Sequence, residues 1–170
     1  FSDVEGRALG ELGKQMGYSP VTMTQVRNEL VAFGFCEEEL KGRSKQLRFG
    51  RNSKDLWNRS RERMRTPVRG SFFGRGSSHG LVRYDGEQEI ETFAVHRKEA
   101  RALIEQGQIV PTPDRDEADF VVNEWSYDPG VLGDSGQIDP LSKFLDLAED
   151  PSPEAGQIRE KIISTVRWSQ

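Results

Sequence analysis

The segment that most constrains the fold is LGELGKQMGYSPVTMTQVRNELVAFGF, residues 9–35 of the 170 in the chain. Ser19 is a favourable N-cap, and Pro20 stands at the first helical position, where its missing N–H costs nothing. Gly34 is typical of the position just after a helix. The pattern therefore predicts two helices joined by a short turn, over residues 5–16 and 20–33.

Apolar residues three and four positions apart predict which side of each helix is buried. They are Leu9, Leu12 and Met16 in the first helix, and Met23, Val26, Leu30 and Phe33 in the second. The outward side of the second helix then carries Thr22, Gln25 and Asn28, flanked by Thr24 and Arg27. Gln25 and Asn28 suit paired hydrogen bonds to adenine, and Arg27 suits guanine or a phosphate, in a DNA major groove. The alternative is an ordinary amphipathic helix whose polar side faces water.

A basic loop follows the second helix, between short strands expected at residues 35–36 and 46–49. Its sequence is Lys41-Gly42-Arg43-Ser44-Lys45. A glycine-containing basic loop in this place would lie over the DNA backbone or in an adjacent minor groove. The alternative is a hairpin tip that only increases solubility.

Together these features resemble the helix-turn-helix of bacterial winged-helix regulators, including MarR-like proteins. The resemblance rests on Leu12, Gly17, Ser19, Thr22, Met23, Leu30, Gly34 and Phe35. One departure is Gly13, where the pattern often has alanine. The resemblance implies a winged helix-turn-helix that binds double-stranded DNA through Ser19, Thr22, Thr24, Gln25, Arg27, Asn28, Arg43 and Lys45. It also implies a transcriptional regulator, most economically a repressor, and a homodimer, because such proteins commonly use paired half-sites.

The charges of the chain are divided unevenly along its length. The net charge of −4 combines residues 1–75, with 15 Lys and Arg against 9 Asp and Glu, and residues 76–170, with 9 against 19. A basic first half suits a polyanion. The alternative is two solvated faces that attract one another. The same two interpretations stay open for a group of closely spaced arginines, Arg59, Arg61, Arg63, Arg65 and Arg69.

The whole chain is expected to be α+β, a winged helix-turn-helix followed by a small mixed α/β module. Residues 70–80 contain four glycines and three serines, which predicts a flexible linker or mobile loop. The predicted parts are a DNA-binding domain over 1–69, the linker or loop over 70–84, and an acidic module for a partner, an effector or dimerisation over 85–170.

Within the acidic module, strands are expected at residues 92–95 and 120–122, and helices at 97–106, after Asp139 and at 153–168. The stretches Trp125-Ser126-Tyr127-Asp128-Pro129 and Asp139-Pro140-Leu141-Ser142 are similar to the C-terminal part of larger winged-helix proteins, some of them antitoxin-like regulators. This likeness implies an autoregulator that neutralises a partner protein. A winged-helix module that binds proteins and not DNA is the other function that stays open. The alternative is structural: Trp125 and Tyr127 pack in the core and Asp139 caps a helix.

Enzymatic chemistry finds little support, and no cofactor or metal is expected. Carboxylates of the kind that bind metals are present at Asp114, Asp116, Glu117, Asp119 and Glu124, but they lack a nearby lysine or histidine at a catalytic spacing. The single cysteine, Cys36, excludes an internal disulfide and fits a reducing cytoplasm. Its acidic neighbours should raise its pKa, which makes the thiolate less available. Cys36 is therefore better interpreted as a small buried residue than as a redox sensor. No run of apolar residues is long enough to span a membrane.

Overall fold

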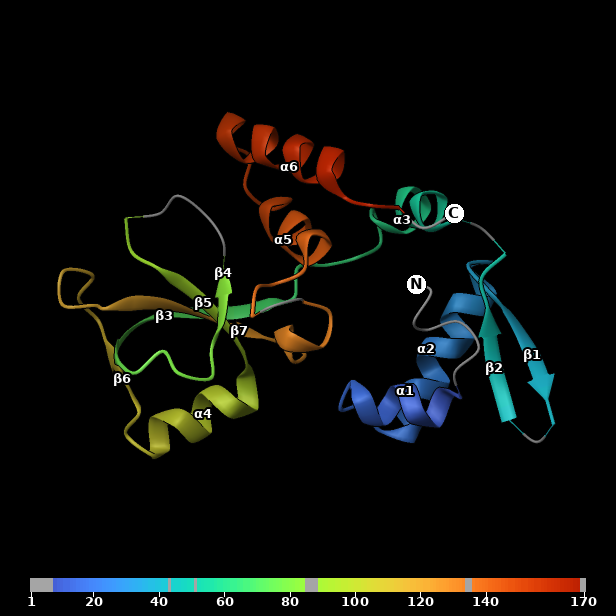
Figure 1. Ribbon diagram of the computed structural model, residues 1–170, viewed down its shortest axis with the longest axis horizontal. Coiled ribbons are helices and arrows are strands. Elements are labelled where there is room, and N and C mark those ends of the chain that lie inside the picture. Colours follow the sequence, from blue (N-terminus) through green and yellow to red (C-terminus); the bar gives the residue numbers. More distant parts are fainter. Residues whose placement is uncertain (1–7, 43, 51, 85–88, 134–135, 169–170) are drawn as a thin grey trace. The chain divides into compact units, whose positions relative to one another are not determined.

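The computed structural model describes residues 8–42, 44–50, 52–84, 89–133 and 136–168 (Figure 1). Within these residues the fold is α+β, as expected, with six α-helices and two β-sheets. The chain forms two compact units, residues 1–64 with 166–170 and residues 65–165. No helix in the described part of the chain is both long and apolar enough to cross a membrane.

The described residues of the first unit form three helices and one hairpin. Their order is α1 (Leu9–Gln15), α2 (Pro20–Ala32), β1 (Glu37–Lys41), β2 (Ser44–Arg48) and α3 (Ser53–Ser60). The predicted capping of α2 is confirmed, because Ser19 Oγ accepts a hydrogen bond from the Thr22 N–H at 3.1 Å. Gly34 follows the helix with a φ of +66°, a conformation that glycine adopts without strain.

The helices α1 and α2 pack closely at Gly13. A Cβ atom on Gly13 would lie 2.7 Å from Met23 Cγ, so glycine fits there and a larger residue would displace the methionine. Leu12 and Met23 are both buried, as the helical spacing predicts. Gly13, which departs from the pattern of winged-helix regulators, therefore has a packing role.

The hairpin lies against the start of the described chain. β1 and β2 are antiparallel and pair from Glu37↔Arg48 to Lys41↔Ser44. Ala8, just before α1, forms an isolated antiparallel bridge with Gln46 of β2. The first strand begins later than expected, at Glu37, because Phe35 and Cys36 are buried residues that connect α2 to the hairpin.

The prediction for the buried side of α2 is only partly correct. Met23 is buried and Leu30 is half-buried, but Val26 is exposed and Phe33 is 48% exposed. On this side lies an apolar cavity lined by residues that include Val26, Leu30, Phe33, Phe35, Leu56 and Met64.

The second unit is built on a five-stranded sheet with the order β4-β5-β7-β3-β6. The strands are β3 (Val68–Gly76), β4 (Val82–Tyr84), β5 (Thr92–His96), β6 (Ile109–Thr112) and β7 (Phe120–Trp125). β5 and β7 are parallel neighbours, and the other neighbouring pairs are antiparallel. The expected strands at residues 92–95 and 120–122 and the expected helix at 97–106 are confirmed by β5, β7 and α4 (Arg97–Glu105).

Each face of this sheet contributes to a separate hydrophobic cluster. On the face that α4 covers (Figure 1), the buried members are Phe93, Val95, Ala100, Ile109, Phe120 and Val122. The second cluster contains Tyr84, Ala94, Trp125 and Ile138. The chain then continues through a short 3₁₀ helix (Pro129–Val131), α5 (Pro140–Leu147) and α6 (Pro153–Thr165).

The structure corrects the linker or mobile loop expected over residues 70–84. β3 runs through the glycine-rich stretch between β7 and β6, and β4 follows it. Two of the glycines are required by close packing. A Cβ on Gly74 would lie 2.8 Å from the ring of Phe120, and one on Gly76 would lie 2.5 Å from the Gln108 carbonyl oxygen. Glycine in a strand can mark such a close approach as well as a loop.

Candidate nucleic-acid interface

The predicted contact residues at the start of α2 take part in its local hydrogen bonding. The hydroxyl groups of Ser19 and Thr22 lie 2.9 Å apart, and Ser19 caps the helix. Thr24 Oγ1 donates to the Pro20 carbonyl oxygen at 2.9 Å. Thr24 and Gln25 are exposed, whereas Thr22 is half-buried. Of these residues, the Gln25 amide is the polar group best placed to meet a ligand on this side of the helix.

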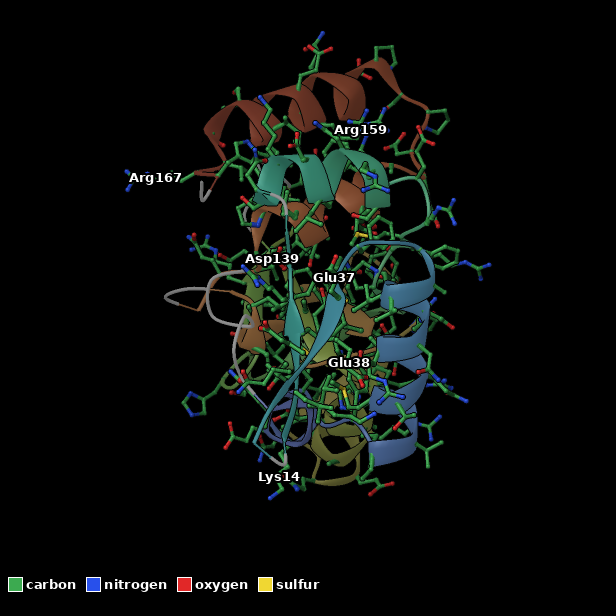
Figure 2. All side chains as sticks on the ribbon, turned by 90° about the vertical axis from the view of Figure 1, so that its right-hand side faces the viewer. Lys14, Glu37, Glu38, Asp139, Arg159 and Arg167 are labelled. Atoms are coloured by element: carbon green, nitrogen blue, oxygen red, sulfur yellow. The ribbon has the colours of Figure 1, made fainter. Side chains whose placement is uncertain are left out.

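Arg27 and Lys45 converge on a residue that the sequence did not indicate, Glu38. Arg27 Nη1 lies 3.0 Å from Glu38 Oε2, and Lys45 Nζ lies 2.8 Å from Glu38 Oε1. Each oxygen of one carboxylate therefore binds a different cation. Figure 2 shows Glu38 on β1, beside α2. We call Arg27, Glu38 and Lys45 the ion-pair cluster.

The register of the hairpin explains why this cluster forms. Glu38 lies opposite Leu47, and Lys45 is two residues before Leu47 on β2, so Glu38 and Lys45 are diagonal neighbours on one face. Leu47, on the same face, is buried. The cluster therefore links the hairpin to α2 through the face that also contributes to the core.

Asn28 completes the environment of Arg27. Its Oδ1 accepts hydrogen bonds from Arg27 Nε at 3.1 Å and from Arg27 Nη2 at 2.8 Å. The Arg27 side chain is only 17% exposed. Paired hydrogen bonds from Asn28 to adenine require the same Oδ1 as an acceptor, so they would compete with the bonds to Arg27.

The Lys45 ammonium donates a hydrogen bond that lowers the pKa of Glu38, and the positive charge of Arg27 adds to this effect. A carboxyl group whose pKa is lower in the folded chain stabilises the fold above its unfolded pKa. This contribution is lost as the pH falls through the folded pKa. At neutral pH the cluster therefore contains a charged carboxylate.

The structure brings together some of the predicted site residues and leaves others apart. Arg27, Asn28 and Lys45 meet around Glu38, and Gln25 stands separately on the exposed side of α2. Arg43 lies outside the described residues. Sequence reasoning missed Glu38 because its partners depend on the strand register and on the packing of α2, and neither is visible in the spacing of residues.

Cys36 lies next to the hairpin and is buried. Burial raises the pKa of its thiol, in the direction that the sequence predicts. The cause differs from the expected one, which was the charge of the neighbouring glutamates. A thiol with a raised pKa contains less of the reactive thiolate at neutral pH.

We expect Cys36 of the folded chain to react slowly with iodoacetamide. Burial and the raised pKa both limit attack, so the modified fraction measured by mass spectrometry should rise much faster in guanidinium-unfolded chain. Equal rates for folded and unfolded chain would contradict this placement of the thiol.

Two of the closely spaced arginines lie over aromatic rings of the first unit. The Arg63 guanidinium is 4.4 Å from the centre of the Phe33 ring, and that of Arg59 is 5.7 Å from the centre of the Phe35 ring. These distances allow cation–π attraction. The two arginines thus lie beside the apolar cavity, which Phe33 and Phe35 line.

Three of the carboxylates weighed as metal ligands, Asp114, Glu117 and Asp119, make local contacts near the ends of β6 and β3. Asp114 Oδ1 accepts from the Asp116 N–H at 2.9 Å, and Asp119 Oδ2 accepts from the Gly76 N–H at 2.8 Å. Glu117 pairs with Arg75 at 3.3 Å. Among the described residues no group of three or more His, Cys, Asp or Glu side chains is arranged to hold a metal ion.

A polar cluster in the second unit connects α5 to the sheet. Tyr84 Oη donates to Asp146 Oδ2 at 2.7 Å, and Thr66 Oγ1 donates to Asp146 Oδ1 at 3.1 Å. Burial raises the pKa of Tyr84, and the charge of Asp146 raises it further. The phenol therefore remains a proton donor to Asp146 at neutral pH.

The structural interpretation of residues 125–129 and 139–142 is supported as well. Trp125 is buried, and Asp139 Oδ1 caps α5.

Comparison of the chain with protein-family models, with curated proteins and with solved structures finds no match in any of the three.

Proposed function

We propose that the chain is a sequence-specific regulator that binds double-stranded DNA through α2 and the β1–β2 hairpin, as a winged helix-turn-helix does. The observation that carries the proposal is the order of α1, a capped α2 and a hairpin, with Arg27 of α2 and Lys45 of the hairpin drawn to one place. Ala8 also pairs with Gln46 of β2 through an isolated bridge, so a third segment of the chain lies beside the hairpin. A small sheet of this kind is compatible with the wing of a winged helix.

In this proposal the exposed side of α2 enters a major groove. Gln25 offers a donor and an acceptor to a base edge on this side. Lys45, and Arg27 where it leaves Glu38, supply positive charge for phosphates. The chain would act as a homodimer on paired half-sites, with repression as the simplest outcome. The acidic second unit would then bind a partner or an effector, which keeps an antitoxin-like role within the same proposal.

The test is a DNA-binding titration at two salt concentrations with DNA from upstream of the protein's own gene. Gln25→Ala/Asn28→Ala should weaken binding by at least about tenfold, since a good bidentate base contact contributes roughly 1–3 kcal/mol. Lys45→Ala should reduce the salt dependence by about one phosphate contact.

Lys54→Ala is the matched control, because Lys54 is an exposed lysine of α3 in the same unit. It should leave affinity and salt dependence nearly unchanged. Absence of binding at both salt concentrations would reject the proposal. So would binding that is indifferent to the α2 variant.

A second candidate function is protein binding through the apolar cavity of the first unit. Phe33 is exposed there, and Arg59 and Arg63 lie beside it, which suits a partner helix with one apolar side and acidic flanks. This candidate predicts a partner that co-purifies with the native chain and with Leu40→Asp, whose leucine is exposed on the hairpin, but not with Phe33→Asp.

A further inference from the structure

Glu38 occupies the place where the proposed interface needs positive charge. Its two carboxylate oxygens bind one cation from α2 and one from β2, at 3.0 and 2.8 Å. Arg27 is the only cationic residue of α2, and Lys45 belongs to the predicted wing. The net charge of the ion-pair cluster is therefore +1, although it contains two cations.

A carboxylate and a DNA phosphate compete for the same donors. Both present oxygen atoms that accept charge-assisted hydrogen bonds from Arg and Lys. Glu38 is held on a strand of the chain itself, so it meets these cations at a high effective concentration. A phosphate that binds Arg27 or Lys45 must displace it or share the cation with it.

We propose that Glu38 is a selectivity residue. It lowers the affinity for non-specific DNA by competing with phosphates for Arg27 and Lys45. This inference rests on the proposed function. Binding to phosphates supplies most of the affinity for non-specific DNA. A chain that keeps its interface cations paired therefore binds tightly only to some sequences. In these, the free energy gained from base contacts, such as those of Gln25, offsets the free energy lost when the ion pairs break.

A purely positioning role for Glu38 predicts the opposite result. If the carboxylate only oriented Arg27 and Lys45 for DNA, its removal would leave both side chains less ordered. Affinity would then fall for every DNA sequence, and fewer phosphates would be contacted. The direction of the change in non-specific affinity therefore separates the two roles.

The experiment compares Glu38→Gln with the native chain on a short random-sequence duplex over a series of salt concentrations. Each cation released to a phosphate should steepen the dependence of log K on log salt by about 0.9 and tighten binding by about tenfold at roughly 0.1 M salt. We expect an effect of one to two such contacts. The ratio of affinities for upstream and random DNA should fall in parallel.

Glu39→Gln is the matched control for this experiment. It removes the same charge from the neighbouring residue of β1, whose carboxylate is 60% exposed and lies 3.5 Å from Arg48 on the other face of the hairpin. Glu38→Asp keeps the charge and should resemble the native chain more closely than Glu38→Gln does. Circular dichroism of all variants checks that each is folded.

The outcomes separate this inference from the function on which it rests. Tighter, more salt-sensitive binding of random DNA by Glu38→Gln than by Glu39→Gln supports selectivity. If the native chain binds upstream DNA and the two variants bind random DNA equally, or Glu38→Gln binds it more weakly, the inference is overturned while the function stands. If neither the native chain nor the variants bind DNA, the proposed function fails and the inference with it.

Discussion

Trp125→Ala is expected to lower the free energy of unfolding of the second unit by about 3–5 kcal/mol, the usual cost of removing a large aromatic side chain from a core. Trp125 is fully buried at the end of β7, and its ring packs edge-to-face against Tyr127 with 5.4 Å between ring centres. Chemical denaturation followed by far-ultraviolet circular dichroism measures the loss. The chain has two compact units, so the variant should shift one part of the transition.

Trp125→Phe is the control for this variant. Trp125 Nε1 is buried without a hydrogen-bond partner among the described residues. Replacing the indole therefore removes none of the hydrogen bonds found among these residues. The phenyl ring keeps part of the packing against Tyr127, and the loss should be clearly smaller than that of Trp125→Ala. Equal losses for the two variants would show that ring packing is not what Trp125 contributes.

Leu47→Ala is expected to destabilise the first unit by about 2–5 kcal/mol, the range for removing a buried leucine side chain. Leu47 is buried on the face of the hairpin that also carries Glu38 and Lys45. Its loss should therefore weaken the attachment of the hairpin as well as the core. The same denaturation measurement applies, and the affected part of the transition should differ from the one that Trp125→Ala shifts.

Leu40→Ala provides the comparison for Leu47→Ala. Leu40 lies on β1, on the same face of the hairpin, but it is 70% exposed. An exposed substitution of this kind should change the stability by no more than about 0.5 kcal/mol. If both leucine variants destabilised the chain equally, the hairpin would not pack through Leu47 as described.

The features that sequence reasoning predicted well are those that depend on local chemistry. The Ser19 cap, the Gly34 end of α2 and the Asp139 cap of α5 each follow from a few adjacent residues. The strands β5 and β7 were also predictable, because runs of β-branched and aromatic residues favour strands.

The features that sequence reasoning missed depend on contacts between distant residues. Gly74 and Gly76 suggest a loop when considered alone, and only the neighbouring Phe120 and Gln108 explain why a strand requires them. The exposure of Val26 and Phe33 depends on which parts of the chain pack against α2, and the helical spacing of residues does not show this. The partners of Glu38 likewise come from another helix and another strand, so no spacing rule identifies them.

The outer edge of β1 has a consequence for how copies of this chain can meet. In the described residues β1 hydrogen-bonds only to β2, which leaves a row of backbone N–H and C=O groups open to a further strand. Such open edges invite aggregation, and charged side chains along them oppose it. β1 carries Glu37 and Glu39 on the face opposite the paired Glu38, so two copies aligned along this edge would bring the like charges of Glu37 and Glu39 close together. We therefore expect this edge to protect the chain from forming extended sheets, and any stable dimer to use a different surface.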